Sequence, residues 1–262
     1  IALSALGVSR DIVVPPVKDM EIAIPGLPAP FDGYRLVQLT DLHISRLFPA
    51  AWTEAVVLQT NALDADLIVI TGDLIDGSVE HRRNDVAALA RLQAPDGVYT
   101  IPGNHEYFFG VDNWMRHFEG QNMRILSNSH VVLARGGAEL VLAGVTDLSA
   151  AATGSPAPDL SAALRGAPAN VPVVLLDHQP MQAAKAAEYG VALQQSGHTL
   201  GGMIVGLDRV VGAANNGFVS GLYQVGGMQL YVNNGTGLWP GFALRLGTTA
   251  ELTRITLRRA AS

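Results

Sequence analysis

Short apolar runs alternate with helical patterns along the first two thirds of the chain. Residues 34–40 and 67–71 are apolar runs that predict buried strands, and residues 49–63 between them place apolar side chains at helical spacing. Further elements are predicted in the same alternating order: a helix at 85–92, a strand at 98–101, a short helix near Trp114, strands at 123–126, 140–145 and 173–177, and a helix at 181–189. This order predicts an α/β fold class.

The other stretches depart from this alternation. Residues 1–33 contain several prolines and predict an extended N-terminal lead-in. Residues 150–170 are rich in small residues and proline, which predicts a surface loop with one short helical turn. Residues 217–257 are strand-like runs punctuated by glycine, so the chain passes from α/β to mostly β. Since no internal repeat divides it, we expect residues 34–262 to form a single domain.

Composition narrows the chemistry that the chain can support. Its 262 residues include no cysteine, which excludes disulfides, thiolate nucleophiles and zinc sites built on cysteine. Any metal ion must therefore be held by His, Asp, Glu or Asn side chains. The formal net charge of −6 argues against a broad basic surface, so we expect no nucleic-acid partner.

Residues that commonly bind metal ions follow five of the predicted strands. The segments are Asp41-Leu42-His43, Gly72-Asp73-Leu74-Ile75-Asp76, Gly103-Asn104-His105-Glu106, Asp177-His178 and Gly197-His198-Thr199-Leu200. Ligands gather at the carboxyl ends of strands in α/β sheets, so residues far apart in sequence converge there. A single histidine near a strand end is more often structural than a metal ligand, and the repetition is what indicates a site. Carboxylate, imidazole and amide ligands suit hard or borderline divalent cations.

Taken in order, these segments resemble the motif series of the calcineurin-like metallophosphoesterase superfamily: D-x-H, G-D-x-x-D, G-N-H-E, H and G-H-x-H. Four of the five motifs are complete, and the resemblance extends over residues 34–257. It implies a two-sheet β-sandwich flanked by helices, a four-layer α/β/β/α fold. It also implies a catalytic domain with a dinuclear metal centre, in which a metal-activated water cleaves phosphomonoester, phosphodiester or pyrophosphate bonds. Manganese, iron and zinc all suit the ligand set.

The resemblance also assigns roles to individual residues. Asp41 and His43 would bind the first metal ion, and Asp73 would bridge both ions. The expected ligands of the second ion are Asn104, His178 and His198. His105 corresponds to the catalytic histidine of the family, which protonates the leaving oxygen or stabilises the phosphoryl charge, and Asp76 to the carboxylate that orients it.

Leu200 departs from the family pattern. The last motif of the family ends in a second histidine that completes the first metal site, whereas leucine has no atom that can bind a metal ion. Three outcomes stay open: weaker but usable metal binding, a single-metal enzyme, or a binding module with reduced or lost turnover. A natural divergence and an engineered His-to-Leu substitution would leave the same sequence. A metal-assisted hydrolase of a non-phosphate ester is a further alternative.

Other residues near the motifs carry weaker predictions. Arg46 follows the first motif and Tyr107 follows the third, so we expect these two side chains to contact substrate, although an exposed arginine and a core tyrosine are alternatives. Phe108 and Phe109 either border the cleft or belong to the core. Glu106 has no assigned ligand role and is expected to organise its loop.

The C-terminal third is similar to a bacterial branch of the superfamily that is often membrane-anchored. Residues 216–223 and 230–239 are similar to that branch, which includes pyrophosphate hydrolases of UDP-2,3-diacylglucosamine. The resemblance implies a small phosphorylated substrate, with lipid-linked and nucleotide-linked compounds both open. The apolar start at Ile1, in place of methionine, fits an N-terminal anchor or signal that has been removed. We therefore expect a membrane-associated or extracytoplasmic domain.

Overall fold

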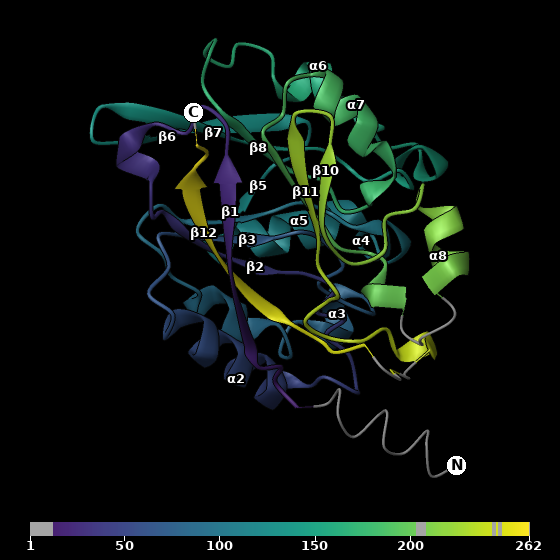
Figure 1. Cartoon of the computed structure of the whole chain (residues 1–262). Coiled ribbons are helices and arrows are strands. Elements are labelled where there is room, and N and C mark those ends of the chain that lie inside the picture. The colour runs from purple at the N-terminus through teal and green to yellow at the C-terminus, as the bar shows by residue number, and fades with distance from the viewer. Residues whose placement is uncertain (1–12, 203–207, 243–244, 246–247, 262) are drawn as a thin grey trace.

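The computed structural model describes residues 13–202, 208–242, 245 and 248–261 and contains two six-stranded sheets (Figure 1). The first sheet has the order β1 (Val17–Ile24), β12 (Leu252–Arg259), β2 (Arg35–Leu39), β3 (Leu67–Ile70), β4 (Val98–Thr100) and β5 (Arg124–Ile125). The second has the order β10 (Gly221–Val225), β11 (Met228–Val232), β9 (Leu193–Ser196), β8 (Val173–Leu176), β7 (Ala138–Gly144) and β6 (Ser129–Arg135). The helices are α2 (Ala50–Asn61), α3 (Val79–Arg82), α4 (Asn104–Phe108), α5 (Val111–Glu119), α6 (Leu160–Ala163), α7 (Ala183–Glu188) and α8 (Asp208–Ala214).

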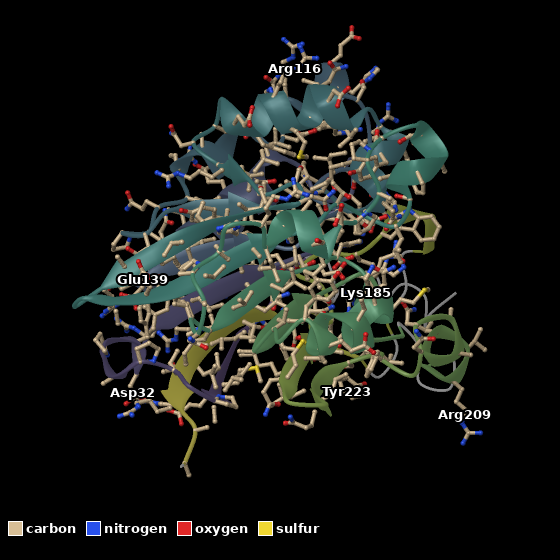
Figure 2. All side chains as sticks on the ribbon, turned by 90° about the horizontal axis from the view of Figure 1, so that it is seen from above. Asp32, Arg116, Glu139, Lys185, Arg209 and Tyr223 are labelled. Carbon is tan, nitrogen blue, oxygen red and sulfur yellow. The ribbon has the colours of Figure 1, made fainter. Side chains whose placement is uncertain are left out.

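Three hydrophobic clusters separate four layers. Helices α2 and α5 pack on the outer face of the first sheet, where Val56 and Trp114 join the cluster that contains Ile70 of β3. Helices α6 and α7 cover the outer face of the second sheet in a separate cluster. In Figure 2 the labelled Arg116 of α5 and Tyr223 of β10 lie on opposite sides of the molecule. The α/β/β/α fold implied by the motifs is confirmed.

The third cluster lies between the sheets. Alternate residues of β3 point to opposite sides, since Val69 belongs to the inter-sheet cluster and Ile70 to the helix-covered one. In β8, Leu176 faces the other sheet while Leu175 faces α7. Both faces of these strands are therefore buried, which explains why they occur in the sequence as continuous apolar runs.

Strand direction brings the motif loops to one edge of the sandwich. Strands β2, β3 and β4 are mutually parallel in the first sheet, and β7, β8 and β9 are mutually parallel in the second. The backbone N–H of Asp41 donates to the carbonyl of Gly72, and that of Gly197 donates to the carbonyl of His178. The backbone N–H of His198, on the second sheet, donates to the Asp41 carboxylate on the first, so the two groups of loops meet.

Strands β1 and β6 were not predicted, and β9 was predicted only as the strand that precedes the fifth motif. Residues 17–24, within the expected lead-in, form β1 and pair in parallel with β12 at the other end of the chain. Residues 129–135 form β6, in a hairpin with β7. The partner of β1 is far away in sequence, and β6 is an edge strand without strong alternation of apolar and polar residues. The local sequence therefore gives little indication of either strand. The predicted helix at 85–92 is a shorter 3₁₀ helix over Ala87–Arg91, and the 150–170 stretch contains a 3₁₀ turn and α6.

Among the described residues, no helix has both the length and the hydropathy needed to cross a lipid bilayer. The predicted anchor or signal, which would precede Ile1, lies outside the described residues.

Gly144 allows the close approach of the two sheets, which makes it a test of the packing. A β-carbon at this position would lie 2.5 Å from Cβ of Leu126 and 2.6 Å from Cγ2 of Ile101. We expect Gly144→Ala to lower the free energy of unfolding by about 1–3 kcal/mol through overpacking. Gly227→Ala is the control, because nothing lies within 4 Å of a β-carbon there. Equal urea-unfolding midpoints for the two variants would contradict this account of the sandwich.

Candidate metal centre

Three of the five motif loops, those of the first, second and fifth motifs, have unusual backbone conformations. Asp41, His43, Asp73 and His198 have φ values of 50°, 43°, 54° and 70°, in the left-handed region that non-glycine residues rarely adopt. Strained residues of this kind cluster at functional sites, where the surrounding structure holds them in place. The loops therefore position these side chains at a cost to backbone energy.

Glycine precedes several of the predicted ligands because the loops pack tightly. A β-carbon on Gly103 would lie 2.3 Å from Oδ1 of Asp73. A β-carbon on Gly197 would lie 2.3 Å from Oδ2 of Asp41. Larger residues at either position would displace the carboxylate, so the glycines of the motifs are required by the geometry of the site.

The first group of possible ligands consists of Asp41, His43 and Asp73. Nε2 of His43 lies 3.8 Å from Oδ1 of Asp41 and 3.8 Å from Oδ2 of Asp73. All three side chains are buried, and their ligand atoms lie within 4.8 Å of one another. Two carboxylates and one imidazole at this spacing fit a borderline divalent cation.

The second group consists of Asp73, Asn104, His178 and His198. Nε2 of His178 lies 3.2 Å from Oδ2 of Asp73 and 3.1 Å from Oδ1 of Asn104. Nδ1 of His198 also lies 3.1 Å from Oδ1 of Asn104. Because Oδ2 of Asp73 faces both groups, the structure places one carboxylate oxygen between two sets of donors.

Hydrogen bonds around the two groups orient their ligand atoms. Nδ1 of His178 donates to the carbonyl of Thr71 at 2.7 Å, which leaves Nε2 free to face the site. The Thr40 hydroxyl donates to Oδ2 of Asp41 at 2.8 Å. The backbone N–H of His105 donates to Oδ1 of Asp73 at 2.8 Å, so Oδ2 is the oxygen that points into the site.

Glu106 connects two of the motif loops. Its carboxylate accepts the backbone N–H groups of Asp73 and Gly103 on one oxygen, at 2.9 and 2.7 Å, and that of Leu74 on the other, at 2.7 Å. Burial and the neighbouring Asp73 raise the pKa of Glu106 to about 8. The prediction that Glu106 organises its loop is confirmed.

Asp76 holds two histidines. Its Oδ1 is hydrogen-bonded to Nδ1 of His105, as the motif resemblance implied, and its Oδ2 lies 3.1 Å from Nδ1 of His43. Nε2 of His105 is therefore turned toward the site, 4.0 Å from Oδ2 of Asp73. The contact with His43 was not predicted, because the sequence gives no sign that one carboxylate has two histidine partners.

The buried charges strongly influence one another. Burial alone would raise the pKa of Asp73, but His178, His43 and His105 hold it well below its usual range. Burial would lower the pKa of His178, yet the contact with Asp73 raises it well above the ordinary value. Burial and the charge on His178 lower the pKa of His198. Binding of a metal ion would replace the proton on His178 as the partner of Asp73.

Leu200 stands at the motif position for which the resemblance implies a second ligand histidine. Its side chain is buried, and its φ of 51° is as unusual as those of the ligands. A β-carbon on Gly235 would lie 2.6 Å from Cδ2 of Leu200 and 3.2 Å from Cβ of Asp41, so the leucine and Asp41 flank the same glycine. The Leu200 carbonyl accepts from Nη1 of Arg245 at 3.2 Å. This corner of the site thus contains an apolar side chain in place of a ligand.

The two predicted substrate contacts occupy different surroundings. Arg46 is exposed. Tyr107 is buried beside Thr146 and Asp147, and burial raises its pKa to about 12. Substrate contact by either residue stays a prediction.

Three other aromatic side chains lie next to His105. The ring centroids of Phe108, Phe109 and Trp239 are 5.4, 6.2 and 6.0 Å from that of His105. Phe108 and Phe109 were considered as either cleft or core residues, and both are exposed. The contact between Trp239 and His105 was not predicted, because nothing in the sequence indicates that a residue so far along the chain lies next to the third motif.

The shared carboxylate gives a direct test of metal binding. We expect Asp73→Ala to lose most of the manganese or zinc bound per chain, since this residue offers an oxygen to both groups of ligands. The metal-dependent rise in unfolding temperature should disappear with it. Elemental analysis and thermal unfolding with and without metal measure both effects. Glu119→Ala, on the exposed end of α5, is the control. Equal metal content in the two variants would contradict the assignment.

A family model and two related proteins all match this chain under the name phosphoesterase or metallophosphoesterase. Residues 34–202 match the sequence model of a family described as calcineurin-like phosphoesterase. A Bos taurus protein named transmembrane protein with metallophosphoesterase domain is 35% identical over 98% of this chain and 60% of its own length. A Bacillus subtilis protein named uncharacterized metallophosphoesterase YkuE is 31% identical over 88% of this chain and 82% of its own length.

The chain spans about 60% of the length of the Bos taurus and Danio rerio relatives that share the transmembrane name. Among solved structures, a sulfate thiohydrolase from Thermus thermophilus has a TM-score of 0.54 at 16% identity, over 88% of this chain and 57% of that protein. This last likeness concerns the fold alone.

Proposed function

The chain belongs to the calcineurin-like phosphoesterase family, and we propose that it cleaves phosphomonoester, phosphodiester or pyrophosphate bonds as a metal-dependent hydrolase. The observation that carries this proposal is the position of Oδ2 of Asp73 between two groups of metal-type donors, beside Nε2 of His105. The chain covers only about 60% of the length of the Danio rerio and Bos taurus relatives, so the activity of the whole protein is proposed here and is not taken from those relatives.

The donor sets fit two divalent cations. Asp41, His43 and Asp73 would hold one ion, and Asp73 with Asn104, His178 and His198 would hold the other. Oxygen and imidazole donors without any thiolate suit manganese, iron or zinc. When bound, such ions lower the pKa of a water molecule and neutralise charge on the phosphoryl oxygens.

His105 is placed to donate a proton to the leaving group. In the reaction, the oxygen of water bonds to phosphorus and one of the water's protons passes to solvent. The bond from phosphorus to the leaving oxygen breaks, the leaving oxygen takes the proton from Nε2 of His105, and solvent then reprotonates His105. Asp76 holds Nδ1 of the same ring, which fixes the direction of Nε2. Burial alone would lower the pKa of His105, but the hydrogen bond that its ring donates to Asp76 raises the pKa above the ordinary value.

Leu200 favours a second candidate, a binding module with reduced turnover. The leucine occupies the corner beside Asp41 and offers no donor atom there. In that case the chain would bind phosphorylated ligands and release little phosphate. A panel of phosphate, thioester and carboxylic-ester substrates separates both candidates from a hydrolase of non-phosphate esters.

We also propose that the domain works beside a membrane on a small phosphorylated substrate. The Bos taurus and Danio rerio relatives carry the word transmembrane in their names and are longer than this chain. Lipid-linked and nucleotide-linked phosphates are the two substrate classes to compare. Fractionation of the full-length protein tests the location: recovery in the membrane pellet supports it, and recovery in the supernatant alone contradicts it.

Replacement of the proposed acid should separate chemistry from metal binding. We expect His105→Asn to lower kcat on an alkyl phosphate by about 100-fold or more, because proton transfer to a poor leaving group is lost. Metal content should stay close to that of the parent chain, since His105 is not among the proposed ligands. The matched control is His81→Asn, because His81 is exposed and only hydrogen-bonded to Ser78. Parent-like turnover in His105→Asn would overturn the role given to this residue.

A histidine at position 200 should strengthen the first metal site. We expect Leu200→His to increase the affinity for manganese, because it adds an imidazole donor beside Asp41, and phosphate release should rise with it. Calorimetric titration and a chromogenic phosphate assay measure the two effects. Turnover by the parent chain with near two metal ions bound would show that the leucine is tolerated. Activity only in Leu200→His would support the binding-module candidate for the chain as it stands.

A further inference from the structure

Three aromatic side chains form a collar around His105. Phe108, Phe109 and Trp239, called the aromatic collar below, have ring centroids within 6.2 Å of the His105 ring. They are 63%, 38% and 40% exposed. Of the phenylalanine and tryptophan side chains that the structure describes, only these three count as exposed. Exposed aromatic rings gathered at one point usually mark a binding site.

The aromatic collar is assembled from two distant parts of the chain and is fixed to the site. Phe108 and Phe109 are at the end of α4, which begins with the third motif, whereas Trp239 lies in the loop after β11. That loop is pinned to the first motif, because the N–H of Thr236 donates to Thr40 and the N–H of Gly237 donates to Asp41. These hydrogen bonds fix the position of the Trp239 loop relative to the metal-type donors of the first motif.

The position of the aromatic collar determines which part of a substrate would meet it. In the proposed function, His105 gives its proton to the leaving oxygen, so the leaving group must lie beside the His105 ring. Besides His43, the described rings that lie next to it are the three of the aromatic collar, and all three are exposed. We propose that the aromatic collar is the leaving-group subsite, and that the substrate is the phosphate ester of an alcohol whose aromatic or alkyl part follows the scissile oxygen directly. This inference rests on the proposed function.

A cavity of ≈ 470 Å³ between α3 and α5 begins at one residue of the aromatic collar, Phe109. Val79 adds apolar surface to this cavity, and polar side chains line the rest of it: Ser78, Glu80, Asn113, Arg116 and His117. A leaving group that is apolar near phosphorus and polar at its far end would match this order of side chains. A short polar alcohol would leave the aromatic rings in water.

A series of alkyl phosphates tests the subsite. Ethyl, n-hexyl and 2-phenylethyl phosphate have leaving alcohols of similar acidity, so differences in kcat/KM report binding of the hydrocarbon part. We expect the metal-loaded parent chain to favour the two larger esters over ethyl phosphate by about tenfold or more, the scale of discrimination in an apolar pocket. Phe109→Ala and Trp239→Ala should each remove most of this preference. Tyr189→Ala, an exposed aromatic residue at the end of α7, should keep it.

The outcomes distinguish this inference from the proposed function. Phosphate release from all three esters at equal kcat/KM overturns the subsite and leaves the hydrolase proposal standing. No phosphate release from any ester, including a chromogenic one, overturns the proposed function itself. If Trp239→Ala changes binding to phospholipid vesicles and leaves the substrate preference intact, the aromatic collar is a membrane contact and the inference is wrong. A preference for 2-phenylethyl over n-hexyl phosphate identifies an aromatic leaving group, and the reverse identifies an alkyl one.

Discussion

The site depends on one buried carboxylate whose two oxygens have different partners. Oδ1 of Asp73 accepts a hydrogen bond from the backbone N–H of His105. Oδ2 lies near His178, which belongs to one group of donors, and near His43, which belongs to the other. The Glu106 carboxylate accepts a hydrogen bond from the backbone N–H of Asp73 and so holds that backbone in place. A carboxylate so deeply buried is stable in its charged form only with cationic partners, and the histidines supply them here. Divalent cations would satisfy the same requirement.

The rest of the fold can be understood as support for that arrangement. Parallel strands in two sheets end at one edge, and the loops after β2, β3 and β9 hold residues at strained, positive φ values. The burial of both faces of each sheet by helices and by the other sheet stabilises these loops. Gly103 and Gly197 then allow the loops to approach the carboxylates more closely than any larger residue would.

Much of this could be predicted from sequence because the decisive features are local. An apolar run followed at once by aspartate, histidine or asparagine marks both a strand and the ligands at its end, as at Asp41 and Asp73. The parts that escaped prediction depend on contacts between distant residues. Strand β1 pairs with the last strand, Asp76 holds His43 as well as His105, and Trp239 returns to the third motif. No local pattern encodes these contacts.

Metal-loaded crystals of the parent chain test the central claim most directly. With manganese present, anomalous scattering should show two ions, one contacting His43 and one contacting His178, with the Asp73 carboxylate between them. One ion on the His178 side alone would mean that Leu200 has removed the first site. No ion at Asp73 at all, or ions bound elsewhere on the chain, would contradict the account of this protein as a metal-dependent hydrolase.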